Sequence, residues 1–159
     1  MTIRIGCGFD AHAFADGRKL ILGGVHIPNA RGLAGHSDAD VLAHAVCDAL
    51  LGALALGDIG EHFPDTDDAY ANADSMMLLS QTAEKVRAAG GDIVNIDASV
   101  VLQSPKLSPH IEEMRRNMAA AAAVNISQIG VKATTTERLG FVGREEGAAA
   151  FAVALVNLK

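Results

Sequence analysis

Two histidines and one carboxylate are spaced in this sequence like the ligands of a metal ion. Asp10 and His12 form an Asp-x-His pair at the end of a predicted strand, where side chains two residues apart leave the same face. His44 lies on a predicted helix, one turn after Asp40 and one turn before Asp48. Three nitrogen and oxygen ligands with a fourth position left open would form a catalytic site of the zinc type.

Helix capping and ordinary packing account for part of this cluster without a metal. Asp38 and Asp40 are expected at a helix N-terminus, where the helix macrodipole favours negative charge. A single helical histidine is also more often a packed or surface group than a ligand. The macrodipole does not explain His44 and Asp48, which lie deeper in an apolar Ala/Leu stretch where burying an unpaired polar group is costly. We therefore predict a metal site in which Asp40 or Asp48 orients His44 by a hydrogen bond.

Four polar segments have the composition of loops that bind phosphate or sugar hydroxyls. One brings His36 and Ser37 to a predicted helix N-terminus, where free N–H groups bind anions. Another places Lys106 beside a helix start, and a third combines hydroxyls with Glu137, a carboxylate suited to magnesium or manganese. Each alone could be an ordinary cap or polar turn. The segments are GHSD (35–38), FPDTD (63–67), LQSPKLSP (102–109) and KATTTERLGFVGREEG (132–147).

Length, charge and composition limit the class of protein. The 159 residues suit one domain spanning 1–159, and a chain that is 50% hydrophobic but 4% aromatic needs an aliphatic core. A net charge of −6 argues against a nucleic-acid or acidic-membrane partner. The N-terminus lacks an apolar signal region, and the longest near-apolar run (41–57) is short for a bilayer. Cys7 and Cys47 form no CxxC motif, so we expect a reduced, cytoplasmic protein.

The elements that must position these residues form an α+β fold. Apolar alternation predicts strands, including a first strand with Ile3, Ile5, Cys7 and Phe9 on one face and a hairpin around Gly23. Together these elements predict a few-stranded mixed sheet with a small hairpin and with helices layered on one face. The predicted strands cover 2–10, 19–28, 92–102, 128–136 and 147–158, the helices 37–57, 75–90 and 108–123, and a turn-rich loop 57–73.

Helix-capping signals set the predicted helix starts. Ser37 is expected to cap the first helix, with Asp40 three residues later in a variant capping box. Asp74 or Ser75 caps the second helix, and Ser108 followed by proline opens the third.

Four long motifs resemble a known family over nearly the whole chain. In order and spacing they resemble the 2-C-methyl-D-erythritol 2,4-cyclodiphosphate synthase family of the non-mevalonate isoprenoid pathway. The motifs are GCGFDAHAF (6–14), GHSDADVLAHAVCDALLGALALGDIGEHFPDTD (35–67), QSPKLSPHI (103–111) and VKATTTERLGFVGREEG (131–147).

The resemblance implies an enzyme, a phosphorus–oxygen lyase. Its substrate would be 4-diphosphocytidyl-2-C-methyl-D-erythritol 2-phosphate, a small CDP-linked molecule. The 2-phosphate would attack the β-phosphorus, close the cyclic diphosphate and expel CMP. Alignment and charge neutralisation are the usual means of catalysing phosphoryl transfer, so the protein need supply no nucleophile.

The resemblance also assigns residues to roles. Asp10, His12 and His44 would hold Zn²⁺ with one position open toward the substrate. Glu137 would hold Mg²⁺ or Mn²⁺, and His36 and Thr135 would stabilise the transition state. The other expected substrate contacts are Asp58, Gly60, Phe63, Pro64, Asp65, Thr66 and Asp67 around the erythritol, Leu102, Gln103, Ser104, Pro105, Lys106, Leu107, Ser108, Ala133 and Thr134 around the cytidine phosphates, and Ser37, Ile59, Thr136, Phe141 and Arg144.

A three-fold homotrimer with active sites between subunits is the assembly that the resemblance implies. Phe9, Arg144 and Glu146 match residues that line a cavity on the three-fold axis in some relatives, a candidate site for an isoprenoid diphosphate. The sequence departs from the family in two places: Cys7 stands where many relatives have histidine, and GREEG (143–147) replaces GRGEG. Neither departure touches a metal ligand, but both could alter the axial cavity.

Two rival functions remain open at this point. A zinc hydrolase would use the metal to activate water, and its product would carry solvent oxygen. A nucleotide-binding regulatory trimer would have no turnover.

Overall fold

The protein contains a five-stranded mixed sheet and a separate two-stranded hairpin. The structure, a computed structural model, describes residues 2–159. The strands are β1 (Thr2–Ala15), β2 (Leu20–Leu22), β3 (Val25–Ile27), β4 (Gly32–Leu33), β5 (Gly91–Val101), β6 (Ile129–Thr134) and β7 (Gly147–Leu158). The helices are α1 (Val41–Ala53), α2 (Ile59–His62), α3 (Ser75–Ala88), α4 (Ile111–Ala122) and α5 (Gly140–Gly143), with 3₁₀ turns at Asp68–Tyr70, Ser108–His110 and Ile126–Gln128.

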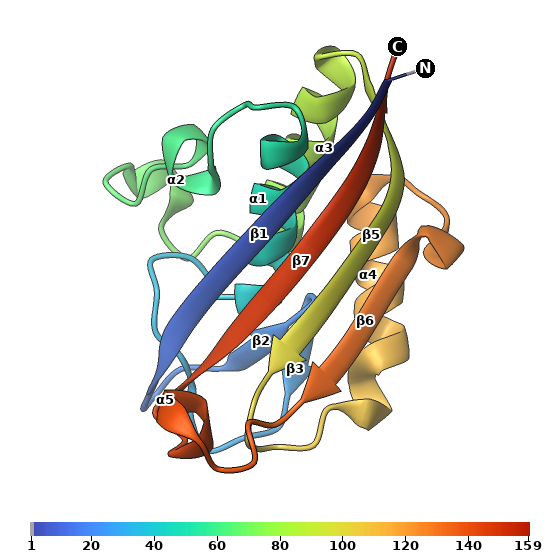
Figure 1. Cartoon of the computed structure of the whole chain (residues 1–159). Helices are drawn as coiled ribbons and strands as arrows, with labels where there is room; N and C mark the ends of the chain where they lie inside the picture. The colour runs from blue at the N-terminus through green and yellow to red at the C-terminus, as the bar shows by residue number, and fades with distance from the viewer. Residues whose placement is uncertain (1) are drawn as a thin grey trace.

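Helices cover one face of the sheet. The strand order is β4-β1-β7-β5-β6, in which β5 and β6 are parallel and the other neighbours antiparallel. Figure 1 views this sheet from its open face, with α1, α3 and α4 behind it. The predicted mixed sheet, hairpin and one-sided helix layer are therefore confirmed. Within residues 2–159, no helix combines the length and apolar composition needed to cross a membrane.

Two glycines allow α1 to lie directly against the first strand. A Cβ atom added to Gly8 would lie 1.9 Å from the carbonyl oxygen of Ala45, and one added to Gly6 would lie equally close to that of Ala49. Gly6 and Gly8 face the helix, and so do the next alternate residues, Asp10 and His12. The close backbone contact therefore brings the side chain of His44 on α1 over the ligand pair on β1.

We predict that Gly8→Ala destabilises the fold by about 3 kcal/mol, because the added methyl group overlaps a helix backbone rather than a flexible side chain. Urea unfolding of metal-free protein measures the change. Gly52→Ala, on the exposed side of α1, is the matched control. Its Cβ would meet only an ordinary contact at 3.9 Å, so it should leave stability unchanged or raise it. Equal stability of the two variants would contradict the close-contact explanation.

The start of the first helix differs from the prediction. Asp40, not Ser37, is the N-cap of α1, and its carboxylate accepts hydrogen bonds from the N–H groups of Ala43, Gly23 and Gly24. The predicted capping box is therefore wrong. A fully buried carboxylate that joins the helix to the hairpin satisfies more donors than the Ser37 hydroxyl could.

Other predicted boundaries also shift. The helix ends at Ala53 rather than near Gly57, and Ala55 follows with a positive φ of 56°. The third helix begins after a 3₁₀ turn, at Ile111, and Ser108 provides no side-chain cap. Asp74 caps α3 as expected. The loop 57–73 holds the short helix α2 and a 3₁₀ turn.

The open face of the sheet carries large apolar side chains. Ile5 is 69% exposed, and Phe9 and Phe151 are each 51% exposed. The two phenylalanines are cross-strand partners whose ring centroids lie 4.8 Å apart. The alternate residues of β7 are buried alanines that face the helices, among them Ala150 and Ala152. The sheet thus turns its small residues toward its own core and its large ones outward.

Candidate active site

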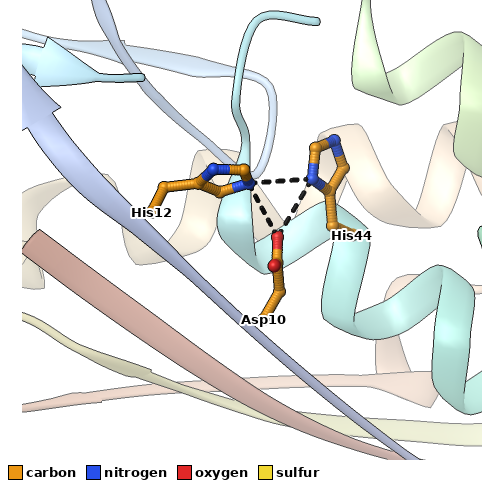
Figure 2. Close-up of side chains that lie close together, drawn as sticks. All are labelled: Asp10, His12 and His44. Atoms are coloured by element: carbon orange, nitrogen blue, oxygen red, sulfur yellow. Dashed lines mark hydrogen bonds and ion pairs between the residues drawn. The ribbon is translucent and has the colours of Figure 1, made fainter. Parts of the chain in front are cut away.

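Asp10, His12 and His44 converge as the sequence predicted. The Oδ2 atom of Asp10 lies 2.8 Å from Nε2 of His12 and 3.0 Å from Nδ1 of His44. The two histidine nitrogens are 3.3 Å apart. Figure 2 shows the three side chains pointing toward one another, two from β1 and one from α1. All three are partly buried, so a bound cation would be held at the edge of the core.

The charges of these groups fit a cation. Burial acts to raise the pKa of Asp10, but hydrogen bonds to His12 and His44 outweigh it and hold that pKa well below its ordinary value. Burial acts to lower the pKa of His44, yet the hydrogen bond to Asp10 and its charge raise it overall. The site therefore favours positive charge between these side chains. One carboxylate and two imidazoles are also ligands that Zn²⁺ accepts.

The groups that orient His44 are not the predicted carboxylates. The Nε2 atom of His44 lies 3.0 Å from the hydroxyl oxygen of Ser75 and 3.2 Å from that of Ser37. Asp48 instead accepts a hydrogen bond from the N–H of Ile59 at 2.8 Å, and burial raises its pKa. The carboxylate of Asp40 is occupied by the helix cap and the hairpin. The prediction that Asp40 or Asp48 orients His44 is therefore wrong.

A first cavity of about 440 Å³ opens beside the three candidate ligands. Among the predicted erythritol contacts, Asp58, Thr66 and Asp67 do not line it. Asp58 caps α2, and the carbonyl oxygen of Asp67 lies 3.2 Å from Nε2 of His36. The predicted residues that line the cavity are Asp10, His12, His36, Ser37, His44, Ile59, Gly60, Phe63, Pro64 and Asp65, and they are joined by Gly35, Asp48, Tyr70 and Leu78, which the sequence did not indicate as substrate contacts.

A second cavity, of about 330 Å³, lies at the ends of β5 and β6. Nearly all of the residues predicted to contact the cytidine phosphates line this cavity. Ser104 is outside it, where its hydroxyl donates a hydrogen bond to Glu145 at 3.0 Å. Its lining is Leu102, Gln103, Pro105, Lys106, Leu107, Ser108, Ile111, Ala133, Thr134 and Thr135.

The chain does not merge these two cavities. Within residues 2–159 they share no lining residue. In the sheet, β7 and β5 lie between β1 and β6. The distance between β1 and β6 is therefore three strand spacings, or roughly 14 Å. The chain therefore presents two separate cavities.

The remaining predicted site residues follow β6 and line neither cavity. Thr136, Glu137, Phe141 and Arg144 all lie in this segment. Glu137 is exposed, and its N–H donates to the Thr135 hydroxyl at 3.1 Å, while that hydroxyl donates to the Glu137 carboxylate at 3.3 Å. Arg144 pairs with Glu146 at 2.9 Å on the surface. Glu137 is thus fixed beside Thr135, which lines the second cavity.

Comparison with known proteins places the chain in a family. The YgbB family model matches residues 3–157. A 2-C-methyl-D-erythritol 2,4-cyclodiphosphate synthase from Syntrophobacter fumaroxidans is 58% identical over 155 residues, 98% of each chain. The bifunctional IspDF of Campylobacter jejuni has a TM-score of 0.95 at 49% identity; the alignment covers 99% of this chain and 43% of that longer one. IspF of Plasmodium falciparum, in a CDP complex, has a TM-score of 0.85 at 34% identity, with 99% and 97% of the chains covered. The chain belongs to the YgbB family, the family of the 2-C-methyl-D-erythritol 2,4-cyclodiphosphate synthases, and it is an enzyme of the phosphorus–oxygen lyase class.

Proposed function

We propose that this protein converts 4-diphosphocytidyl-2-C-methyl-D-erythritol 2-phosphate to 2-C-methyl-D-erythritol 2,4-cyclodiphosphate and CMP. The observation that carries the proposal is the convergence of Asp10, His12 and His44 beside a cavity, in a chain of this family. An oxygen of the 2-phosphate forms a bond to the β-phosphorus. The bond from that phosphorus to the oxygen bridging to the α-phosphate breaks, and CMP leaves with the bridging oxygen.

The protein's part in this reaction is to align two phosphates and to neutralise their charge. A Zn²⁺ ion held by Asp10, His12 and His44 would supply Lewis-acid stabilisation of phosphate charge. His36, on the wall of the same cavity, donates its Nε2–H to the carbonyl oxygen of Asp67 and, in its protonated form, would donate from Nδ1 to a phosphate oxygen. Thr135, on the wall of the second cavity, would donate to a phosphate oxygen from the nucleotide side once its hydroxyl turns from the Glu137 carboxylate to the substrate. These contacts strengthen as charge develops in the transition state.

The second cavity is the proposed binding site for the cytidine phosphates. Lys106 is the cationic side chain on its wall and would bind an α-phosphate, and no ion pair among the described residues includes it. Glu137 at the rim would hold Mg²⁺ or Mn²⁺ against the diphosphate. The CDP complex of the Plasmodium falciparum relative supports a nucleotide diphosphate as the ligand class.

We propose a homotrimer in which the first cavity of one subunit, the first half-site, and the second cavity of its neighbour, the second half-site, together form each active site. Two observations support it. The two half-sites are separated within the chain, and the open sheet face exposes a strip of large apolar side chains on its central strands. Exposed apolar patches of this kind are typical of protein interfaces. Three copies packed through this face would bury Phe9 and Phe151 near the three-fold axis.

We also propose the axial cavity of such a trimer as a site for an isoprenoid diphosphate. Phe9 supplies an apolar wall, and the exposed Arg144–Glu146 pair supplies the polar end. Binding of an isoprenoid diphosphate to wild-type protein and to Arg144→Ala, compared by calorimetry, tests this proposal.

Incubation with the named substrate, Zn²⁺ and Mg²⁺ tests the proposed reaction directly. Phosphorus NMR should show the cyclic diphosphate and CMP appearing in equal amounts. In water enriched in oxygen-18, mass spectrometry should find no label in either product, because no water enters the reaction. Labelled product would instead indicate the zinc hydrolase, and substrate that stays unchanged would leave only a nucleotide-binding function.

We predict that Glu137→Gln keeps zinc but needs much more Mg²⁺ or Mn²⁺ for activity. The amide has the same shape but lacks the charge that a hard divalent cation requires. Titration of activity with each metal ion measures the change, and elemental analysis checks the zinc content. An unchanged dependence on the divalent ion would remove Glu137 from this role.

A further inference from the structure

A chain of hydrogen bonds runs from His44 away from the candidate metal site. The Nε2 atom of His44 lies 3.0 Å from the hydroxyl oxygen of Ser75, the first residue of α3. This hydroxyl donates a hydrogen bond to a carboxylate oxygen of Asp38, in the loop before α1. The other carboxylate oxygen of Asp38 accepts the N–H of Ser75 at 3.0 Å. Ser75 is completely buried, so solvent does not replace any of these bonds.

The order of donors and acceptors in this chain is fixed by chemistry. An ionised carboxylate only accepts hydrogen bonds, so the single hydroxyl hydrogen of Ser75 points to Asp38. The Ser75 oxygen can then only accept from Nε2 of His44, which favours hydrogen on Nε2. The Ser37 hydroxyl, 3.2 Å from the same nitrogen, can accept this hydrogen as well. Because a neutral imidazole has one N–H, the Nδ1 atom is left with its lone pair.

The lone pair on Nδ1 of His44 faces Asp10 and His12, where it could bind the metal ion. Nδ1 of His44 is the atom that lies 3.0 Å from Asp10 and 3.3 Å from Nε2 of His12. Histidine ligands of metals usually donate their other N–H to an acceptor that fixes the tautomer and the ring orientation. Here a serine held by a carboxylate would be that acceptor.

We propose that Ser75 and Asp38 are positioning residues that hold His44 in the Nε2–H tautomer and thereby prepare Nδ1 for the metal. Neither residue lines the cavity beside the triad, so both would act through His44 and not on the substrate. The inference rests on the metal role of His44 in the proposed function and adds two residues to it.

The tautomer of His44 in metal-free protein is the first test. Long-range proton–nitrogen NMR correlations, recorded at a pH above the pKa of His44, distinguish the two neutral forms. Wild-type protein should show hydrogen on Nε2. In Ser75→Ala the share of the Nδ1–H form should rise, because Asp10 at 3.0 Å offers Nδ1 an acceptor while Nε2 keeps only the more distant Ser37 hydroxyl at 3.2 Å. Wild-type protein with hydrogen on Nδ1 would overturn the inference.

Zinc affinity is the second test, measured by competition with a chromophoric chelator. Ser75→Ala should bind Zn²⁺ about 10- to 100-fold more weakly than wild-type protein. Asp74→Ala is the matched control, since it removes the N-cap of the same helix without touching His44. It should lose helix stability but keep zinc affinity.

Two results would contradict the inference: unchanged affinity in Ser75→Ala, or an equal loss in Asp74→Ala, which would mean that fraying of α3 is the cause. Wild-type protein that binds no zinc would instead overturn the metal site of the proposed function. The tautomer measured without metal would still decide whether Ser75 and Asp38 orient His44.

Discussion

His44→Ala protein should fold, yet retain almost no zinc and less than about a thousandth of the wild-type activity. The loss of activity corresponds to the several kcal/mol of transition-state stabilisation that a catalytic metal supplies. The fold should survive because the aliphatic side of α1, which includes Leu42, Val46 and Leu50, still packs in the core. Elemental analysis measures zinc, phosphorus NMR measures turnover, and circular dichroism checks the helices.

His26→Ala is the matched control for this experiment. His26 is an exposed histidine on the hairpin, outside both half-sites, so its removal should change neither zinc content nor turnover. Full zinc occupancy in His44→Ala would show that the ligand set is wrong. Loss of zinc with full activity would instead separate the metal from catalysis.

Two inactive variants should restore activity when they are co-expressed. His44→Ala breaks the first half-site, and the double variant Lys106→Ala/Thr135→Ala breaks the second. In a ring of three, every mixed trimer has one boundary where an intact first half-site meets an intact second half-site. Random assembly restores about a quarter of all sites, since each half is intact with a chance of about one half at any boundary of the ring.

Native mass spectrometry must first show that the co-expressed trimers are mixed. A mixture of the two variants purified separately, and combined without subunit exchange, is the control and should stay inactive. Mixed trimers no more active than this control would mean that both half-sites serve one subunit, and the shared active site would be excluded. A monomer in solution would exclude the trimer itself.

The sequence predicted most elements of the fold because their signals are local. Alternation identified β7 despite its many alanines, and Asp74 marked the start of α3. Alternation separates the two faces of a strand but does not say which face is buried. Phe151 and Val153 face outward while the alanines between them pack against helices, and only the paired glycines of β1 explain why. Small residues were needed where a helix backbone touches the sheet.

The candidate metal ligands Asp10 and His12 were predictable because their signal is also local in sequence. The residues that support His44 were not predictable. Asp10 and His12 share one strand face, so their spacing alone brings them together. Ser75 is 31 residues from His44 in sequence and 37 from Asp38, and only the packing of α3 beside α1 unites them. The sequence offered Asp74 and Ser75 as equivalent caps. Since Asp74 takes the cap, the Ser75 hydroxyl can link Asp38 to His44.

Small and large residues alternate along β1, and this pattern also disfavours pairing of the strand out of register. If β1 slipped by one residue, Phe9 would turn toward α1, where even a methyl group on Gly8 would overlap the helix backbone. Asp10 and His12 would at the same time move to the open face, away from His44. In this misfolded chain, the Phe9 side chain would keep α1 from packing against β1, and Asp10 and His12 could not meet His44. The candidate ligands would therefore report correct folding, because a chain able to bind metal through them has already paired its first strand in register.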